Sequence, residues 1–256
     1  MGEHKNILKY NNQLVMYGSD YLRYEPPPLQ PTYPTNGLIV RYAFEDNLYD
    51  SANSYNLTSA GTAAYATGKV GKGHSFNGSN EAYTTDATIR AIFDYNYAYT
   101  IALWFNSADT TYRILFGCDG TNSPPYKRTW IDRRGSTEIH FERFRSYSMG
   151  GVGAVGVSIT GLSLSVGTWY HIVVVYTGSD AVFYLNGTNI PYTPNTGWNT
   201  YKGASMDSGG TLQTTIGGNR QNNVSQFLGI IDQVYIYNRA LTQSEVSQLY
   251  NGGAGV

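Results

Sequence analysis

Cysteine, charged residues and long apolar segments are scarce in this chain of 256 residues, and each shortage excludes a class of protein. The one cysteine, Cys118, cannot form a disulfide within the chain, so the fold depends on packing alone. Lys and Arg number 17 against 18 Asp and Glu, and this balance argues against a nucleic-acid binder, which needs a basic surface. No stretch approaches the roughly 18 to 20 apolar residues of a membrane span.

The N-terminus also lacks an apolar run that could form the core of a signal peptide. We therefore expect a soluble chain that is not exported by the ordinary route. Glycine (29 residues) and tyrosine (24 residues) are abundant, which favours strands joined by tight turns. An aromatic content of 14% is enough to build a core, so disorder throughout is excluded.

Three regions follow one another along the chain. Residues 1–25 hold two short apolar pieces, 7–10 and 13–17, which predict a β-hairpin or an extended arm. Residues 26–36 contain five prolines and predict a stiff, extended linker. Residues 37–256 then read as one domain, so the prolines hold an arm that needs a partner to lie on.

Strand patterns dominate the domain after the linker. Apolar and polar residues alternate, or apolar residues run continuously, in segments bounded by turn residues. Asn186-Gly187 predicts a two-residue hairpin turn, and Thr242 with Glu245 forms a capping box that begins the one helix we expect. The prediction is an all-β, two-sheet antiparallel jelly-roll sandwich with one short C-terminal helix. The strongest strand segments are 38–44, 101–105, 112–117, 137–144, 169–177, 181–188 and 227–238.

The segments GLIVRYAFEDNLYDSAN, YTIALWFN, GTWYHIVVVYTGSDAVFYLNGT and FLGIIDQVYIYNRALTQSEVSQLYNGG occur in this order. Together they resemble the laminin-G-like branch of the concanavalin A-like lectin/glucanase superfamily, over about residues 37–253. The resemblance implies a concanavalin A-like jelly roll. It also implies a mostly non-catalytic role, as a binding module for glycans or proteins or as a structural spacer.

Catalytic patterns are missing from the sequence. Glycoside hydrolysis needs two carboxylates about 5 to 9.5 Å apart across a sugar, and no ExDxE string is present. Glu138 and Glu142 share a face of one predicted strand but lie about 13 Å apart along it, at about 3.3 Å per residue. We therefore predict that the protein is not an enzyme. An active glycosidase would require two acids at sugar-spanning distance on the concave sheet face.

One acidic residue stands out as a candidate metal ligand. Asp232 follows the alternation of Ile230 and Val234, so its carboxylate is expected to face the core and to need a partner. Asp50 and Asn56 lie in the loop after the first strand, and oxygen ligands of this kind suit Ca²⁺. The resemblance implies a structural calcium here as well. The alternative is that Asp232 caps loop amides and that the other two are solvated turn residues.

Two clusters are candidate ligand-binding sites. Six of the 17 basic residues fall between residues 127 and 145, among aromatic residues, which suits the stacking of a sugar or the binding of an acidic polymer. A second cluster lies in the polar segment 195–203. The alternatives are a solvated strand face with a core tryptophan, and a loop tryptophan that plugs the edge of the sandwich. The candidate residues are Tyr126, Arg128, Trp130, Arg133, Trp198 and Tyr201.

The combined features predict a non-catalytic structural or adhesive component of a larger assembly, specifically a phage virion appendage or decoration protein. In this interpretation residues 1–25 bind other subunits, either in a homo-oligomer or on a capsid or tail protein, and the jelly roll binds surface glycans. The alternative is a carbohydrate-binding module, cytoplasmic or attached to an enzyme system. An arm buried against another chain would favour the first, and a free arm in a monomer would favour the second.

Overall fold

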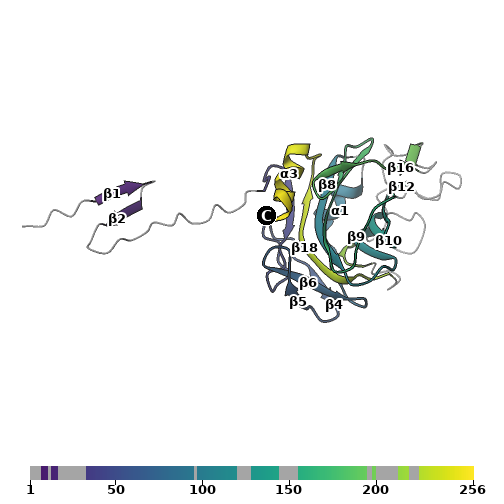
Figure 1. The fold of residues 1–256 in the computed structure, drawn as a ribbon, viewed down its shortest axis with the longest axis horizontal. Helices are drawn as coiled ribbons and strands as arrows, with labels where there is room; N and C mark the ends of the chain where they lie inside the picture. Colours follow the sequence, from purple (N-terminus) through teal and green to yellow (C-terminus); the bar gives the residue numbers. More distant parts are fainter. Residues whose placement is uncertain are drawn as a thin grey trace, which may run out of the picture. The chain divides into compact units, whose positions relative to one another are not determined.

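The computed structural model describes residues 7–10, 13–16, 33–94, 97–119, 128–143, 155–194, 198–199, 213–218 and 225–256. The chain divides into two units, residues 1–32 and 33–256 (Figure 1). In the first unit, β1 (Ile7–Tyr10) and β2 (Gln13–Met16) form an antiparallel hairpin in which Ile7 pairs with Met16. The second unit contains the rest of the fold.

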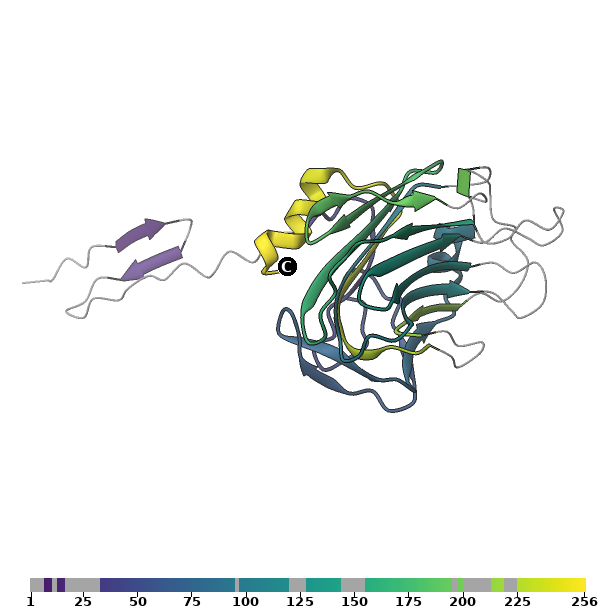
Figure 2. The same ribbon diagram turned by 45° about the vertical axis from the view of Figure 1, so that its right-hand side comes forward.

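The second unit is a sandwich of two antiparallel sheets, as predicted (Figure 2). The front sheet has the order β16 (Thr193–Pro194), β12 (Val155–Ile159), β11 (Glu138–Arg143), β10 (Arg128–Arg134), β9 (Arg113–Asp119), β17 (Gln213–Ile216), β7 (Glu81–Thr84) and β4 (Thr58–Ala60). The back sheet has the order β15 (Thr188–Ile190), β14 (Ala181–Leu185), β13 (Trp169–Tyr176), β8 (Tyr99–Ser107), β18 (Leu228–Tyr237), β6 (Lys72–Asn77) and β5 (Tyr65–Thr67), and β3 (Leu38–Tyr42) also pairs with β18.

The main core fills the space between the sheets. Ile131 and Phe141 from the front sheet meet Leu103, Val174 and Ile236 from the back sheet, and all five are buried. Alternation along each strand places these side chains inward and their neighbours outward. Burial of this apolar surface is the main contribution to stability, because no disulfide is present in the chain.

Local signals in the sequence are confirmed at two turns. Asn186 and Gly187 both have positive φ (51° and 75°), and Leu185 pairs with Thr188 across this two-residue turn between β14 and β15. Thr242 caps α3 (Gln243–Tyr250), with both hydrogen bonds of the capping box to Glu245 present. The short 3₁₀ turn η1 (Asn251–Gly253) follows α3.

One helix was not predicted. The helix α1 (Ala87–Asp94) begins after Asp86, whose Oδ1 accepts a hydrogen bond from Thr88 N at 2.7 Å. Its Ile89 and Phe93 are fully buried in the main core. The described part of the chain contains no helix long and apolar enough to cross a membrane.

A second, smaller core covers the outer face of the back sheet. Val173 and Tyr235 from that sheet pack with Val246 and Leu249 of α3, and Tyr33 packs against them from the end of the linker. Figure 2 shows α3 in yellow on the outside of this sheet, while β9–β12 form the layer on the other side. The outer face of the back sheet is therefore occupied by the protein's own residues.

Candidate functional site

The best candidate for a ligand-binding surface is the outward side of the β10–β11 hairpin in the front sheet. Gly135, with φ of 69°, lies in the tight turn that joins the two strands. Because Ile131 and Phe141 point into the core, the residues that alternate with them point outward. The register pairs Trp130 with Glu142, Asp132 with His140 and Arg134 with Glu138, and we call these six residues the outer hairpin face.

A compact polar group occupies the middle of the outer hairpin face. Arg134 Nε donates to Asp132 Oδ1 at 2.7 Å, and Arg134 Nη2 lies 2.9 Å from His140 Nδ1. A guanidinium can only donate, so Nδ1 accepts and the imidazole proton is assigned to Nε2. The Nδ1 atom also lies 3.3 Å from Asp132 Oδ2 and 3.9 Å from Glu142 Oε2. Asp132, His140 and Glu142 are all buried.

A glycine on the neighbouring strand makes room for the imidazole. A Cβ at Gly156 of β12 would lie 2.9 Å from His140 Nε2 and 3.0 Å from Cε1, closer than real Cβ atoms approach. Gly156 pairs with Glu142, and Ser158 on the same strand donates to Glu138 Oε1 at 2.7 Å. Strand β12 thus extends the polar surface of the hairpin sideways.

The accessible end of the face carries an aromatic ring. Tyr112 is 38% exposed, and the guanidinium carbon of Arg134 lies 5.7 Å from the centre of its ring. The side chain of Arg134 is itself 37% exposed and that of Glu138 is 25% exposed. An aromatic ring beside hydrogen-bonding groups can pack on the C–H face of a sugar and bond its hydroxyls. The buried polar group supports this accessible end from below.

Two acids on the face meet the distance criterion for glycoside hydrolysis. Asp132 Oδ2 and Glu142 Oε2 lie 3.3 and 3.9 Å from the same nitrogen of His140, so they are at most about 7 Å apart. The sequence analysis considered only Glu138 and Glu142 on one strand and missed this pair, which crosses two strands. However, Asp132 is held by Arg134 and His140, which suits an orienting role better than attack on a sugar.

The structure separates the predicted ligand-binding residues. Trp130 belongs to the outer hairpin face, but it is largely buried. Arg133 points between the sheets and donates to the carbonyls of Asp109 and Leu164. Trp198 is fully buried in the main core, so neither Arg133 nor Trp198 can contact a ligand in this arrangement. Tyr126, Tyr201 and the side chain of Arg128 lie outside the described residues.

The prediction that Asp232 shares a face with Val234 is wrong. Gln233 has a φ of 47°, and the pairing of β18 with β8 shifts register between Asp232 and Tyr235. This bulge adds one residue, so Asp232 leaves the main core and faces the loop before β6. Its Oδ2 accepts from Lys69 N at 2.7 Å and Val70 N at 2.9 Å.

Asp50 is also surrounded by backbone donors. Its Oδ1 accepts from the amides of Arg41 and Ala52, both at 2.9 Å, and its Oδ2 accepts from Asn53 and Tyr55 at 3.1 and 3.3 Å. Asn56 Oδ1 in turn accepts from Asp50 N at 2.9 Å.

Asp50, Asn56 and Asp232 therefore do not fit a calcium ion, because amide hydrogens, not a cation, occupy the oxygen lone pairs. Within the described ranges, no three His, Cys, Asp or Glu side chains are grouped so that they could hold a metal. The alternative for Asp232, a carboxylate that caps loop amides, agrees with the geometry.

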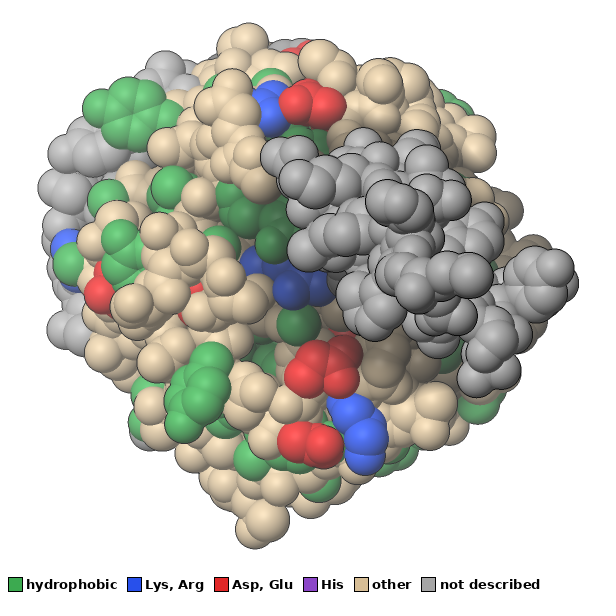
Figure 3. All heavy atoms as spheres, turned by 90° about the vertical axis from the view of Figure 1, so that its left-hand side faces the viewer, with side chains coloured by type: hydrophobic (Ala, Val, Ile, Leu, Met, Phe, Trp, Pro, Cys, Tyr) green, Lys and Arg blue, Asp and Glu red, His purple; other side chains and the backbone are tan. Residues whose placement is uncertain are grey.

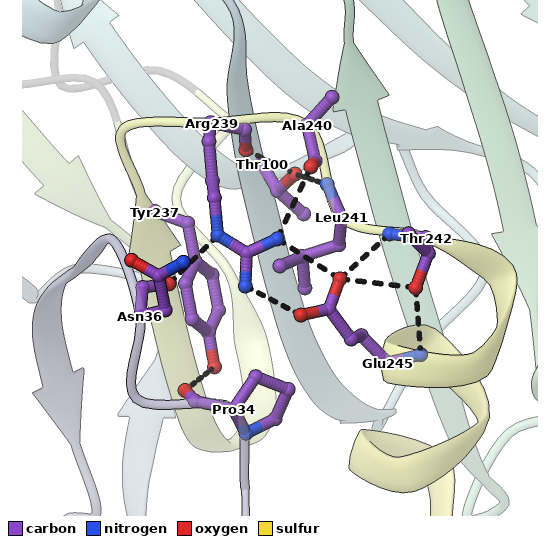
Figure 4. Close-up of polar contacts among 9 residues, drawn as sticks. All are labelled: Pro34, Asn36, Thr100, Tyr237, Arg239, Ala240, Leu241, Thr242 and Glu245. Atoms are coloured by element: carbon purple, nitrogen blue, oxygen red, sulfur yellow. Dashed lines mark hydrogen bonds and ion pairs between the residues drawn. The ribbon is translucent and has the colours of Figure 1, made fainter.

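The linker joins the domain on the side opposite to the outer hairpin face. Tyr237 Oη donates to the Pro34 carbonyl at 2.9 Å, and Arg239 Nε donates to the Asn36 carbonyl at 2.8 Å (Figure 4). Arg239 also forms an ion pair with Glu245 of α3. These contacts lie on the back sheet and α3, so the linker is attached behind the sandwich and the outer hairpin face lies in front.

The side of the molecule that carries α3 offers less for a polar ligand. Figure 3 shows acidic and basic side chains there singly or in small groups among polar and apolar ones. In the part of this side not drawn in grey, no broad patch of one charge sign is visible. The front sheet therefore remains the better candidate.

Comparisons with known proteins agree with the architecture. A family model described as concanavalin A-like lectin/glucanases superfamily matches residues 76–247. Domain 4 of an extracellular arabinanase from Geobacillus stearothermophilus, solved with arabinotriose, is similar with a TM-score of 0.62 and 22% identity over 86% of this chain and 98% of that one. No curated protein sequence matches the chain.

Parts of larger proteins are also similar. The binding domain of Paraclostridial Mosquitocidal Protein 1 has a TM-score of 0.63 and 19% identity, over 86% of this chain and 53% of that one. Trypanosoma rangeli sialidase, solved with sialic acid, has a TM-score of 0.60 and 20% identity, over 87% of this chain and 34% of that one. At these identities the likeness shows the fold alone.

Proposed function

The chain belongs to the concanavalin A-like lectin/glucanase superfamily, and from this premise we propose that its jelly roll is a non-catalytic glycan-binding domain. The observation that carries the proposal is the outer hairpin face, where an exposed tyrosine adjoins a preorganised polar group. Similar structures include binding domains and a domain solved with a neutral sugar, which supports the proposal.

The geometry of the face suits binding to hydroxyl groups. Arg134 and Glu138 are partly exposed and are held in place by Asp132, His140 and Ser158, so little side-chain entropy is lost when a ligand binds. Tyr112 adds apolar contact area beside them. A shallow site of this kind recognises a sugar ring through stacking and a few hydrogen bonds.

Catalysis is the second candidate function, because Asp132 and Glu142 lie at sugar-spanning distance. The pairing of Asp132 with Arg134 and the burial of both acids favour binding. The two functions are separated by incubating the protein with each bound oligosaccharide and measuring released reducing ends. Binding without release supports the proposal, and release that is lost in Glu142→Gln contradicts it.

The binding experiment uses a glycan array, followed by calorimetry with the best ligand. Tyr112→Ala is expected to weaken binding at least tenfold, as aromatic contacts at the centre of binding sites do. Tyr49→Ala is the matched control, because Tyr49 is 66% exposed and lies in the loop after β3 of the back sheet. Equal affinities of the two variants would refute the assignment of the site.

We also propose that the domain is displayed on a larger assembly, specifically a virion, by its N-terminal hairpin. Support comes from the linker, which Tyr237 and Arg239 fix behind the sandwich, away from the outer hairpin face. A two-stranded hairpin has two open edges and is marginal alone, so it suits strand addition to a partner.

Deletion of residues 1–30 tests the display. The truncated chain should fold, remain soluble and keep its glycan affinity, while it no longer joins oligomers or particles of the full chain. Normal assembly of the truncated chain, measured by sedimentation and copurification, would show that the hairpin is not the anchor.

A further inference from the structure

We propose that the outer hairpin face selects uncharged or amino-bearing glycans and rejects glycans that carry carboxylate or sulfate groups. This inference rests on the proposed glycan-binding function and names its ligand class. It also reverses the expectation from the sequence, where the basic residues of 126–145 suggested an acidic polymer.

The charges on the face are unequal. Three carboxylates, those of Asp132, Glu138 and Glu142, point outward from the hairpin, and one guanidinium, that of Arg134, lies among them. Arg134 Nε lies 2.7 Å from Asp132 Oδ1, and its Nη1 lies 3.9 Å from Glu138 Oε1. His140 Nδ1 accepts from Arg134, so the imidazole adds no charge. The described residues of the face thus hold an excess of two negative charges.

The other arginines described on this hairpin are turned away from the face. Arg133 is buried between the sheets against two backbone carbonyls. Arg143 is buried at the other end of β11, with its guanidinium carbon 3.9 Å from the ring centre of Tyr176. Alternation along the strands puts both on the inward side, so a basic sequence segment produces an acidic outward surface.

The position of Arg134 decides how an anionic ligand is received. An arginine that binds a ligand carboxylate offers two parallel N–H groups, but here Nε and Nη2 are directed at Asp132 and His140. A ligand carboxylate would instead lie near Glu138 and Glu142. Like charges about 5 Å apart, at an effective dielectric constant of about 20, weaken binding roughly a hundredfold. An ammonium group gains from the same field.

Matched ligand pairs test the inference directly. Oligogalacturonate and its methyl ester differ only in charge, as do glucosamine and N-acetylglucosamine oligomers at pH 6. We expect the ester to bind at least tenfold more tightly than the acid, and the amine to bind at least as tightly as the acetamide. Raising the salt concentration should narrow both differences, because screening weakens interactions between exposed charges.

Charge-removing variants assign the effect to the face. Glu138→Gln and Glu142→Gln should each raise the affinity for oligogalacturonate relative to its ester severalfold. Asp46→Asn is the matched control, because it removes one negative charge from an exposed side chain near Lys72 of the back sheet and should leave the ratio unchanged. Melting temperatures of all variants identify any loss of folding.

The outcomes separate the two claims. If the acid binds as tightly as the ester, the charge selection is wrong while glycan binding stands. An equal change of the ratio in Asp46→Asn would also overturn it, because the effect would then belong to net charge. If no member of either pair binds, and the glycan array is also negative, glycan binding itself fails and the selection fails with it.

Discussion

Replacement of Asp232 by asparagine tests how the back sheet holds the loop before β6. Asp232 is fully buried, and its carboxylate accepts hydrogen bonds from the backbone amides of Lys69, Val70 and Gln233. None of these partners is a cation. Burial raises the pKa of Asp232 from its usual 3.8 to about 7, although the three amides act in the opposite direction. Asparagine has nearly the same shape but does not titrate in this range.

The raised pKa of Asp232 has a consequence for stability with a definite sign. Between pH 3.8 and pH 7 the folded state keeps the proton and the unfolded state has lost it, so the free energy of unfolding falls as pH rises. Each pH unit in this window corresponds to about 1.4 kcal/mol. From pH 5 to pH 7 the wild type should lose about 3 kcal/mol relative to Asp232→Asn.

Urea unfolding of both proteins at pH 5, 6, 7 and 8 measures this difference, because buffers and other titrating groups affect both alike. The difference between the two free energies should fall from pH 5 to pH 7 and then level off. A bound calcium ion would require the ionised carboxylate and would give a difference that rises with pH and disappears in chelator. A flat or rising difference therefore refutes the reasoning.

Three further predictions concern other parts of the domain. Burial lowers the pKa of His171 to about 3, so its share of stability is lost as pH falls below 6.5, and His171→Phe should reduce the loss between pH 8 and pH 5 by about 2 kcal/mol in urea unfolding. Arg239→Ala breaks the ion pair with Glu245 and the bond to the linker and should lower the melting temperature by about 2 to 8 °C in calorimetry. Gly156→Val should displace His140 and weaken glycan binding severalfold, and unchanged affinity would show that the imidazole has no part in the site.

Features with local causes were predicted correctly from the sequence. The hairpin turn at Asn186-Gly187 and the helix cap at Thr242 depend on neighbouring residues only, and both are present. The helix α1 also had a local signal, because Asp86 precedes apolar residues at helical spacing, but the signal covers only two turns. Short elements of this length are stabilised by packing that the sequence alone does not show.

The site depended on contacts between separate elements. Asp132 meets His140 and Glu142 only when the β10–β11 register is known, and Gly135 in the turn was the available signal for that hairpin. The bulge at Gln233 shifted the alternation around Asp232, and Gln is an uncommon residue at positive φ. Trp198 is buried by residues from distant segments, so its polar sequence neighbours indicated exposure that the fold does not give.

Chemical-shift mapping with a bound neutral oligosaccharide tests the central claim most directly, because it locates the ligand without a mutation. On titration, the largest amide shifts should occur in β10 and β11, together with the indole N–H of Trp130 and the amide of Tyr112. Residues of α3 and of β3 in the back sheet should remain unchanged. Shifts confined to α3 or the back sheet at saturation would contradict the account, because they would place the ligand on the side where the linker is attached.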